Sequence, residues 1–392
     1  MIYIHVPFCR SFCTYCGFYS EVAPKSCSSR LVRGQENRFE EYVSALESEI
    51  KERQDDIARV FASNDVNTLY IGGGTPSVLP LEAFRRIVAA LRQAGAPEKY
   101  SEFTVEVNPE DVVEKGIAYI QGLMSLGVNR ISMGVQSFDD DILKWMNRRH
   151  TASGAVDAYR ILEDAGVRNI SIDLIFGLPQ LTDRLWEDTL NKALNISSRG
   201  VRPNHISAYQ LSIEEDSALE KMIAGGSCAE ASEEMCQRQY SMLCSVLSDA
   251  GYVHYEVSNF AREGFEAKHN SAYWRHVPYV GLGPAAHSYM SESARQWNLS
   301  DVNAYVKAAE AGDFAAVRDG EQLEQEQMDL ETVMLALRTS AGVNESLLRR
   351  IGNASAVCRA LEIGNLVRLQ GGNVRIPENR FFISDNIISS IV

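Results

Sequence analysis

The sequence predicts an α/β protein with one parallel sheet and a smaller second domain. Its 392 residues, of which 45% are hydrophobic and 23% are charged, are typical of a globular protein and can form one large core and a satellite domain. Apolar, strand-like segments alternate with amphipathic helical stretches, and this alternation favours a parallel sheet. A change in composition near residue 320 marks the start of the second domain.

Six segments carry the apolar pattern of buried strands. They lie at residues 3–6, 67–73, 102–107, 129–135, 169–177 and 204–211. Most are separated by helical stretches, and the stretches at 81–95 and 153–166 show clear amphipathic spacing. Six units are too few for a complete barrel of eight βα units, but the functional side chains are still expected at the carboxyl ends of the strands.

Three cysteines lie close together after the first strand, in "YIHVPFCRSFCTYCGFYS". Cys9, Cys13 and Cys16 have the spacing C-x3-C-x2-C. Zinc sites prefer four ligands, commonly in two separated pairs, and no second pair of Cys or His is nearby. Three thiolates suit a 4Fe-4S cluster and leave its fourth iron open to a small molecule. A cluster is therefore the favoured interpretation, with zinc or plain thiols as the alternative.

The other five cysteines are not expected to bind metal. Cys228, Cys236 and Cys244 recur every eight residues, which rotates each side chain about 80° from the last around a helix, so they share no ligating face. We interpret them as small buried hydrophobic residues. Cys358 belongs to an amphipathic helix, and Cys27 lies in a polar loop where neighbours seldom fix ligand geometry.

Polar residues follow several of the predicted strands. "GGGTP" at 72–76 offers backbone polar groups for close approach to a ligand, although a tight turn before proline explains it equally well. Glu106, Gln136 and Asp173 lie in apolar strand contexts, where an unpaired carboxylate or amide is costly. Each could bond a neighbouring loop. The three residues lie at equivalent positions in successive strand–helix units, which favours a ligand that all three contact. Carboxylates suit the ribose hydroxyls or an ammonium group of such a ligand.

Charge and hydropathy exclude some classes of function. The formal net charge of −14, with no strongly basic stretch, makes nucleic acid an unfavourable partner, but it does not exclude a membrane-bound client protein. The chain opens directly into "MIYIHVPF", without the pattern of a secretory leader, and no apolar run is long enough to span a membrane. We therefore expect a cytoplasmic protein, in which cysteines stay reduced.

The cysteine spacing, with Tyr15 just before the last cysteine, resembles the radical S-adenosylmethionine (radical SAM) proteins. The flanking "YIHVPFC" narrows the resemblance to the branch that contains oxygen-independent coproporphyrinogen III oxidase and the heme chaperones. This resemblance implies an open, six-unit partial TIM-type barrel over residues 1–320, a 4Fe-4S cluster on the three cysteines and SAM at the open iron. It places these residues at the SAM site: Tyr3, Tyr15, Gly73, Gly74, Thr75, Glu106, Gln136, Arg148 and Asp173.

The sequence departs from the oxidase at two places. The oxidase has a further cysteine two residues after the third, where this chain has Phe18. Only eight residues precede Cys9, which leaves no room for the leading segment that helps to cover the oxidase's substrate site. Both departures predict that the chain is not an active coproporphyrinogen decarboxylase.

A second motif, H-N-x-x-Y-W, resembles the signature of the heme chaperones. It comprises His269, Asn270, Tyr273 and Trp274. Imidazole is a common axial ligand of heme iron, and Tyr and Trp can pack on a porphyrin face, so the resemblance implies heme contact. The alternative is a buried histidine in an aromatic cluster. His287 is a second candidate for heme contact, whereas His5 is expected to be structural.

Residues 321–392 are predicted to form a winged-helix-like domain. An amphipathic helix at 328–343 is followed by a second helix and by a hairpin with Gly371 and Gly372 at its turn. Such domains often bind DNA, but the small number of basic residues favours a role as a lid or in docking a client protein.

The resemblance leaves two functions open. A heme chaperone would carry heme to client apo-proteins, with the cluster, its electron donor and SAM controlling assembly or transfer. A radical decarboxylase would cleave SAM with one electron from the cluster, and the 5'-deoxyadenosyl radical would remove a hydrogen from a propionate and trigger loss of carbon dioxide. Phe18 and His269 favour the chaperone.

Overall fold

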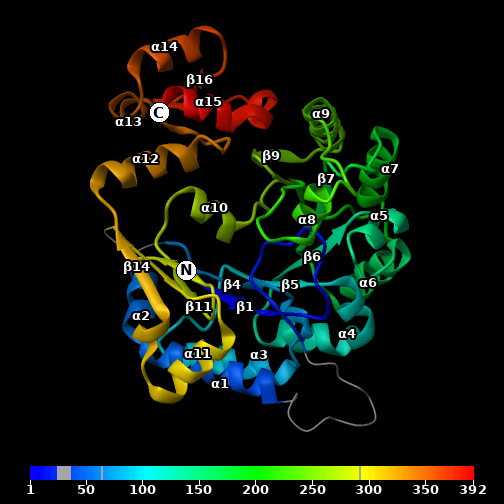
Figure 1. Ribbon diagram of the computed structural model, residues 1–392, viewed down its shortest axis with the longest axis vertical. Coiled ribbons are helices and arrows are strands. Elements are labelled where there is room, and N and C mark those ends of the chain that lie inside the picture. Colours follow the sequence, from blue (N-terminus) through cyan, green and yellow to red (C-terminus); the bar gives the residue numbers. More distant parts are fainter. Residues whose placement is uncertain (24–36, 63–64, 291–292) are drawn as a thin grey trace.

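A central sheet of nine strands organises the molecule (Figure 1). The computed structural model describes residues 1–23, 37–62, 65–290 and 293–392, so Cys27 lies outside the described residues. Six neighbouring strands run parallel in chain order: β1 (Ile2–Val6), β4 (Thr68–Gly73), β5 (Glu102–Val107), β6 (Arg130–Gln136), β7 (Ile170–Phe176) and β8 (His205–Gln210). They confirm the predicted α/β class and the six predicted strands.

The sheet continues beyond these six strands on both sides. β11 (Val280–Leu282) pairs in parallel with β1. On the other side β10 (Asn259–Ala261) is antiparallel to β8, and β9 (Val253–Glu256) is antiparallel to β10. Among the described residues, β11 and β9 form the two edges and do not pair with each other. The sheet is therefore an open, partial barrel, as expected, but with three short strands that the sequence pattern did not reveal.

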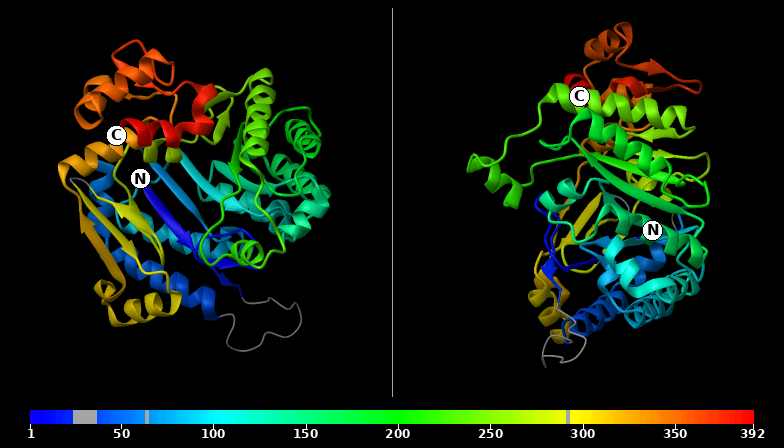
Figure 2. Two further views of the ribbon diagram at one scale, coloured as in Figure 1. Left: turned by 45° about the horizontal axis from the view of Figure 1, so that its top comes forward. Right: turned by 90° about the vertical axis from the view of Figure 1, so that its right-hand side faces the viewer.

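Helices follow most of the parallel strands and cover the sheet (Figures 1 and 2). They are α1 (Asn37–Glu52), α2 (Gln54–Ala62), α3 (Leu81–Gln93), α4 (Pro109–Ser125), α5 (Asp140–Trp145), α6 (Ala152–Ala165), α7 (Asp183–Leu194), α8 (Ala218–Ala224) and α9 (Glu233–Asp249). The predicted helices at 81–95 and 153–166 are α3 and α6. α6 begins where the Thr151 side chain accepts a hydrogen bond from Gly154 and ends at Gly166, whose left-handed backbone suits glycine.

A second sheet of three strands follows β11. β12 (His287–Tyr289), β13 (Ala294–Asn298) and β14 (Arg318–Gln322) are antiparallel, and α11 (Val302–Ala311) connects the last two. β14 crosses the predicted division at residue 320 because it pairs along its length with β13. The division of the chain into two domains at that point stays a prediction.

The C-terminal segment contains helices and a short sheet. Its elements are α12 (Gln325–Ala336), β15 (Val343–Asn344), α13 (Glu345–Ile351), α14 (Ala354–Glu362), β16 (Val367–Arg368), β17 (Asn373–Arg375) and α15 (Ser384–Ile391). The hairpin of β16 and β17 turns at Gly371 and Gly372, both with positive φ, as predicted. The helix predicted at 328–343 ends earlier, at Ala336, because Val343 pairs with β17 as part of β15. In the described part of the chain, no helix is long and apolar enough to cross a membrane.

Candidate cluster and cofactor site

The cysteine loop is fixed to the body of the protein at several points. β2 (Phe8–Cys9) pairs with β3 (Glu21–Val22), which closes the ends of the loop. Near its middle, the Thr14 backbone N–H donates to the carbonyl of Met146 (3.2 Å), and the Thr14 carbonyl accepts from Leu219 (2.8 Å). The loop is therefore held between the end of α5 and the start of α8, which fixes the positions of its thiols.

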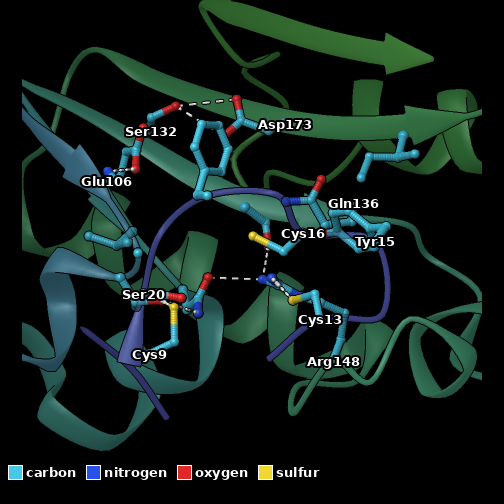
Figure 3. A pocket seen from close by; sticks show the side chains of 18 of the residues that line it. Cys9, Cys13, Tyr15, Cys16, Ser20, Glu106, Ser132, Gln136, Arg148 and Asp173 are labelled. Carbon is cyan, nitrogen blue, oxygen red and sulfur yellow. Dashed lines mark hydrogen bonds between the residues drawn. The ribbon is translucent and has the colours of Figure 1, made fainter. Parts of the chain in front are cut away.

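The three thiols line one cavity of about 500 Å³ at the carboxyl ends of the parallel strands (Figure 3). Cys9 Sγ lies 3.3 Å from Thr75 Oγ1, and Arg148 donates to Cys13 Sγ over 3.4 Å. Within the described residues, no three His, Cys, Asp or Glu side chains are arranged to hold a single metal ion. A 4Fe-4S cluster takes each thiolate on a different iron, so three thiols around one cavity are the ligand set that it requires.

The glycine-rich turn lies directly against the cysteine loop. A Cβ at Gly73, where φ is +106°, would come within 2.6 Å of the His5 ring, and one at Gly74 would come within 2.7 Å of the Phe8 carbonyl oxygen. The Thr75 N–H donates to that same carbonyl (2.7 Å). The glycines are thus required for packing within the chain, and they also line the cavity together with Thr75.

Two carboxylates converge on the cavity from β5 and β7. Glu106 accepts hydrogen bonds from the Tyr70 hydroxyl (2.6 Å) and the Gly73 N–H (3.1 Å), and burial raises its pKa to about 7. Asp173 accepts from Ser132 (3.2 Å to each oxygen), and burial raises its pKa to about 6. Two carboxylates kept in one enclosure with raised pKa values are typical of a site for a cationic or hydroxyl-bearing ligand.

Gln136 and Arg148 complete the predicted polar set. Gln136 lines the cavity with φ at +65°, which is uncommon for a residue other than glycine and turns the chain at the end of β6. Arg148 donates to the Gly134 carbonyl (2.7 Å) and to Asn108 (2.9 Å), but its buried Nε has no hydrogen-bond partner among the residues that the structure describes. A buried cation with a spare donor fits the carboxylate of an amino-acid ligand.

Tyr3 and Tyr15 differ in their positions. Tyr15 lines the cavity beside the cysteines, and burial raises its pKa. Tyr3 is not among the residues that line the cavity; its hydroxyl bonds His5 Nδ1 (3.0 Å) and its ring packs near Tyr70. The structure therefore brings together all the predicted SAM-site residues except Tyr3.

The cavity also contains side chains that the motifs did not indicate. Ser132 lies opposite Glu106 in the sheet, and Ser207 lies opposite Asp173, so both serines face the same interior. The alternation of side chains along a strand is a signal that could have found them, because Ser132 is four residues before Gln136 on one face of β6. These hydroxyls add donors beside the two carboxylates.

The H-N-x-x-Y-W motif lies at the opposite end of the barrel, on α10 (Lys268–Trp274). The N–H groups of Lys268 and His269 donate to the carboxylate of Glu102 (2.8 and 2.9 Å), and His269 Nδ1 bonds Thr68 Oγ1 (2.8 Å). Thr68 and Glu102 are the first residues of β4 and β5, whereas the cysteines lie at the carboxyl ends of the strands. His269 therefore lies at the opposite end of the strands from the cysteines, although Asn270 of the same motif lines the cluster cavity.

His269 is fully buried and both of its ring nitrogens are engaged. Nε2 bonds the Tyr273 hydroxyl (2.9 Å), the ring packs beside that of Tyr70 at 5.2 Å, and burial lowers the His269 pKa to about 3. This geometry is the buried aromatic cluster of the alternative interpretation. An axial bond from His269 to iron would require one of these hydrogen bonds to break, and heme contact at His269 stays a prediction.

The remaining candidates for heme contact are dispersed. Asn270 lines the cluster cavity, Tyr273 lines a second cavity, and Trp274 lines neither. His287 is exposed on β12 and stacks on Trp297, away from both cavities. His5 is buried and bonds the Tyr19 carbonyl (2.9 Å), consistent with the structural role expected for it.

Similar proteins of known family show to which family this chain belongs. Residues 3–193 match the radical SAM superfamily. Over 344 residues the chain is 32% identical to the heme chaperone HemW of Bacillus subtilis, covering 88% of this chain and 84% of that protein. The chain belongs to the HemW family. A HemW heme chaperone of Mycobacterium tuberculosis is 31% identical over 394 residues, covering 100% of this chain and 94% of that protein.

A solved structure confirms the fold of this HemW-family chain. The coproporphyrinogen III oxidase HemN of Escherichia coli, a radical SAM enzyme, superposes with a TM-score of 0.77 over 99% of this chain and 89% of that chain, at 21% identity. For a HemW-family member with a radical SAM domain, the family implies a 4Fe-4S cluster and SAM, and the cavity described above has the thiols and polar groups that both require.

Proposed function

We propose that this HemW-family chain is a heme chaperone that binds heme and delivers it to client apo-proteins in the cytoplasm, including membrane-bound clients. The observation that carries this proposal is identity of 31–34% to proteins named heme chaperones, along 87% or more of this chain. The acidic net charge of −14 suits a protein partner better than a nucleic acid.

The cluster cavity supports the cofactors of this proposal. Cys9, Cys13 and Cys16 hold the 4Fe-4S cluster, which supplies one-electron chemistry when bound and requires an electron donor. Arg148 is placed for a carboxylate. Glu106 and Asp173 are placed for the ammonium group or ribose hydroxyls of SAM. Phe18, 69% exposed at the cavity, stands where the oxidase has a further cysteine, which disfavours the decarboxylase.

Two assays on anaerobically reconstituted protein test the proposal. Titration with heme should produce a saturable heme absorption band, and heme-loaded protein should transfer heme to a client apo-protein at a rate that rises with client concentration. Transfer to apomyoglobin, which captures free heme, should instead be limited by dissociation and independent of its concentration. In the second assay, coproporphyrinogen III with SAM and reductant should yield no vinyl products. Vinyl products from the unmodified protein would replace the chaperone with the radical decarboxylase.

A further inference from the structure

The first cavity, which the three cysteines line, extends into the barrel toward α10. Its lining includes Asn270 of the H-N-x-x-Y-W motif, and Arg130 and His205 at the amino ends of β6 and β8. Side chains two residues apart on a strand share a face and are about 6 to 7 Å apart along it. Arg130 therefore lies one layer deeper than Ser132, which bonds Asp173 in Figure 3. We call the layer of Arg130, His205 and Asn270 the inner end of the cavity.

Arg130 is a buried cation without an ion-pair partner. It is 3% exposed, and its Nη1 donates to Asn169 Oδ1 (3.1 Å) and to the Phe265 carbonyl (3.4 Å), which are both neutral groups. Among the described residues, no carboxylate forms an ion pair with Arg130, and its Nε and Nη2 have no hydrogen-bond partner. The equally buried Arg53 pairs with Asp56 (3.1 Å). Because arginine is seldom buried unless its charge is paired, Arg130 lacks a partner that an anionic ligand can supply.

The side chains around Arg130 do not neutralise its charge. Asp173 bonds Ser132 (3.2 Å), and although burial raises its pKa while the charge of Arg130 lowers it, the two form no ion pair within the described structure. Both ring nitrogens of His205 are hydrogen-bonded, over 2.7 Å each. Burial, with a smaller contribution from the charge of Arg130, lowers the His205 pKa well below its ordinary value, so the ring is neutral. Arg130 is therefore the charge that a ligand meets at the inner end.

Two further polar side chains at this end lack hydrogen-bond partners. The side-chain amide of Asn270 lines the cavity and bonds no residue that the structure describes. Thr104, the register partner of Arg130 on β5, has a buried hydroxyl without a partner in the same described part of the chain. A guanidinium and an amide both donate hydrogen bonds, so Arg130 and Asn270 have free donors for the two oxygens of a carboxylate.

We propose that Arg130 and Asn270 form a carboxylate-binding site at the inner end of the first cavity, and that a propionate of heme occupies it. The inference rests on the proposed chaperone function, which supplies the ligand, because heme has two propionates. It names residues that recognise the porphyrin and assigns no iron ligand. Heme contact at the motif is part of the same arrangement, since Asn270 belongs to the motif. Arg148, beside Cys13 at the other end of the cavity, stays available for the carboxylate of SAM.

The test compares heme with its dimethyl ester, in which both propionates are uncharged. In absorbance titrations, the unmodified full chain should bind heme about tenfold or more tightly than the ester. In Arg130→Gln the ratio of the two affinities should fall toward one, because heme loses its cation and the ester does not. Arg130→Lys keeps a positive charge and should keep part of the ratio. A purely structural role of Arg130 would weaken both ligands alike and leave the ratio unchanged.

A second cation in the same cavity provides the matched control. Arg149 also lines the first cavity, but its side chain is 35% exposed and pairs with Glu110 (3.7 Å), so Arg149→Gln should keep the ratio of the unmodified protein. Asn270→Ala removes the second donor and leaves the buried cation in place, so it should lower the ratio by a smaller factor. Thermal unfolding shows whether each variant is folded, and Asn270→Ala keeps the site testable if Arg130→Gln does not fold.

The outcomes separate this site from the proposed function. If the ratio is unchanged in folded Arg130→Gln and Asn270→Ala, or if the unmodified protein binds heme and its ester equally, the propionate site is wrong and the chaperone function stands. If Arg130→Gln weakens SAM binding by calorimetry and leaves the ratio unchanged, the carboxylate at this site is that of SAM and the heme assignment is likewise wrong. If the unmodified protein binds no heme, the proposed function fails and this inference with it.

Discussion

The two ends of the barrel differ in how fully their polar side chains are hydrogen-bonded. At the carboxyl end, the thiols are half-buried, and Phe12 and Phe18 are 49% and 69% exposed. Arg148 Nε has no hydrogen-bond partner within the described part of the chain. At the amino end, His269 is fully buried and both ring nitrogens are bonded. Polar groups left available indicate a ligand site, whereas polar groups that bond one another indicate a structural role. A motif alone does not distinguish the two.

Loss of a cluster thiol should produce the largest effect. Cys9→Ala, Cys13→Ala or Cys16→Ala removes one of three thiolate ligands, so each variant should lose most bound iron and sulfide after anaerobic reconstitution. Iron and sulfide analysis provides the measurement. Cys228→Ala, in the segment before α9, is the control and should keep both. Normal iron content in all three variants would show that these thiols hold no cluster.

Substitution of His269, at the amino end of the barrel, should lower the stability of the protein. His269→Ala removes a buried ring and leaves Thr68 and Tyr273 without their partners, so it should lower the free energy of unfolding by about 2 to 4 kcal/mol. Thermal unfolding measures the change. His287→Ala, at an exposed position of β12, should cost less than about 1 kcal/mol. Equal stability of the two variants would contradict the structural role of His269.

Substitution of Glu106, a carboxylate at the carboxyl end of the barrel, should produce a smaller, pH-dependent effect. Burial raises the pKa of Glu106 from 4.5 to about 7, so the folded state binds more protons than the unfolded state between these values. Stability is therefore greatest below about pH 4.5 for this group and falls as pH rises toward about 7. In cluster-free protein, Glu106→Gln should reduce the fall in the free energy of unfolding between about pH 4.5 and about pH 7 by about 1 to 3 kcal/mol.

Glu256 provides a matched control at a different place. It is buried in β9, and burial raises its pKa to about 7 as well. Thermal midpoints at about pH 5 and pH 7.5 should move closer together in both Glu106→Gln and Glu256→Gln. Only Glu106→Gln should also weaken SAM binding by calorimetry. Unchanged SAM affinity there would make Glu106 a structural carboxylate like Glu256.

The sequence predicted most of the sheet, because long apolar strands carry a clear pattern. The pattern did not reveal β9, β10 and β11, since strands of three or four residues are too short to show it clearly. The cysteine spacing and the polar strand ends predicted which side chains line the first cavity, apart from Tyr3, because local spacing and the register of parallel strands determine which side chains meet there.

The sequence could not place the aromatic motif or the second cavity. H-N-x-x-Y-W does not reveal which end of the barrel α10 occupies, because that depends on the contacts of Glu102 and Thr68 more than 160 residues earlier. His276 lies two residues after the end of the motif, but its Nδ1 contacts the Thr332 hydroxyl (3.1 Å), 56 residues later. Such assignments depend on tertiary contacts that no local pattern encodes.

α10 contributes to both cavities, Asn270 to the first and Tyr273 to the second, one helical turn apart. The contacts are continuous, since Tyr273 bonds His269, His269 packs on Tyr70, and Tyr70 bonds Glu106. Any displacement of α10 caused by filling one cavity therefore changes the free energy of filling the other. Thermodynamic linkage makes that change reciprocal: if a ligand in the first cavity alters the affinity of the second cavity for its ligand by a given factor, the second ligand must alter the affinity of the first by the same factor.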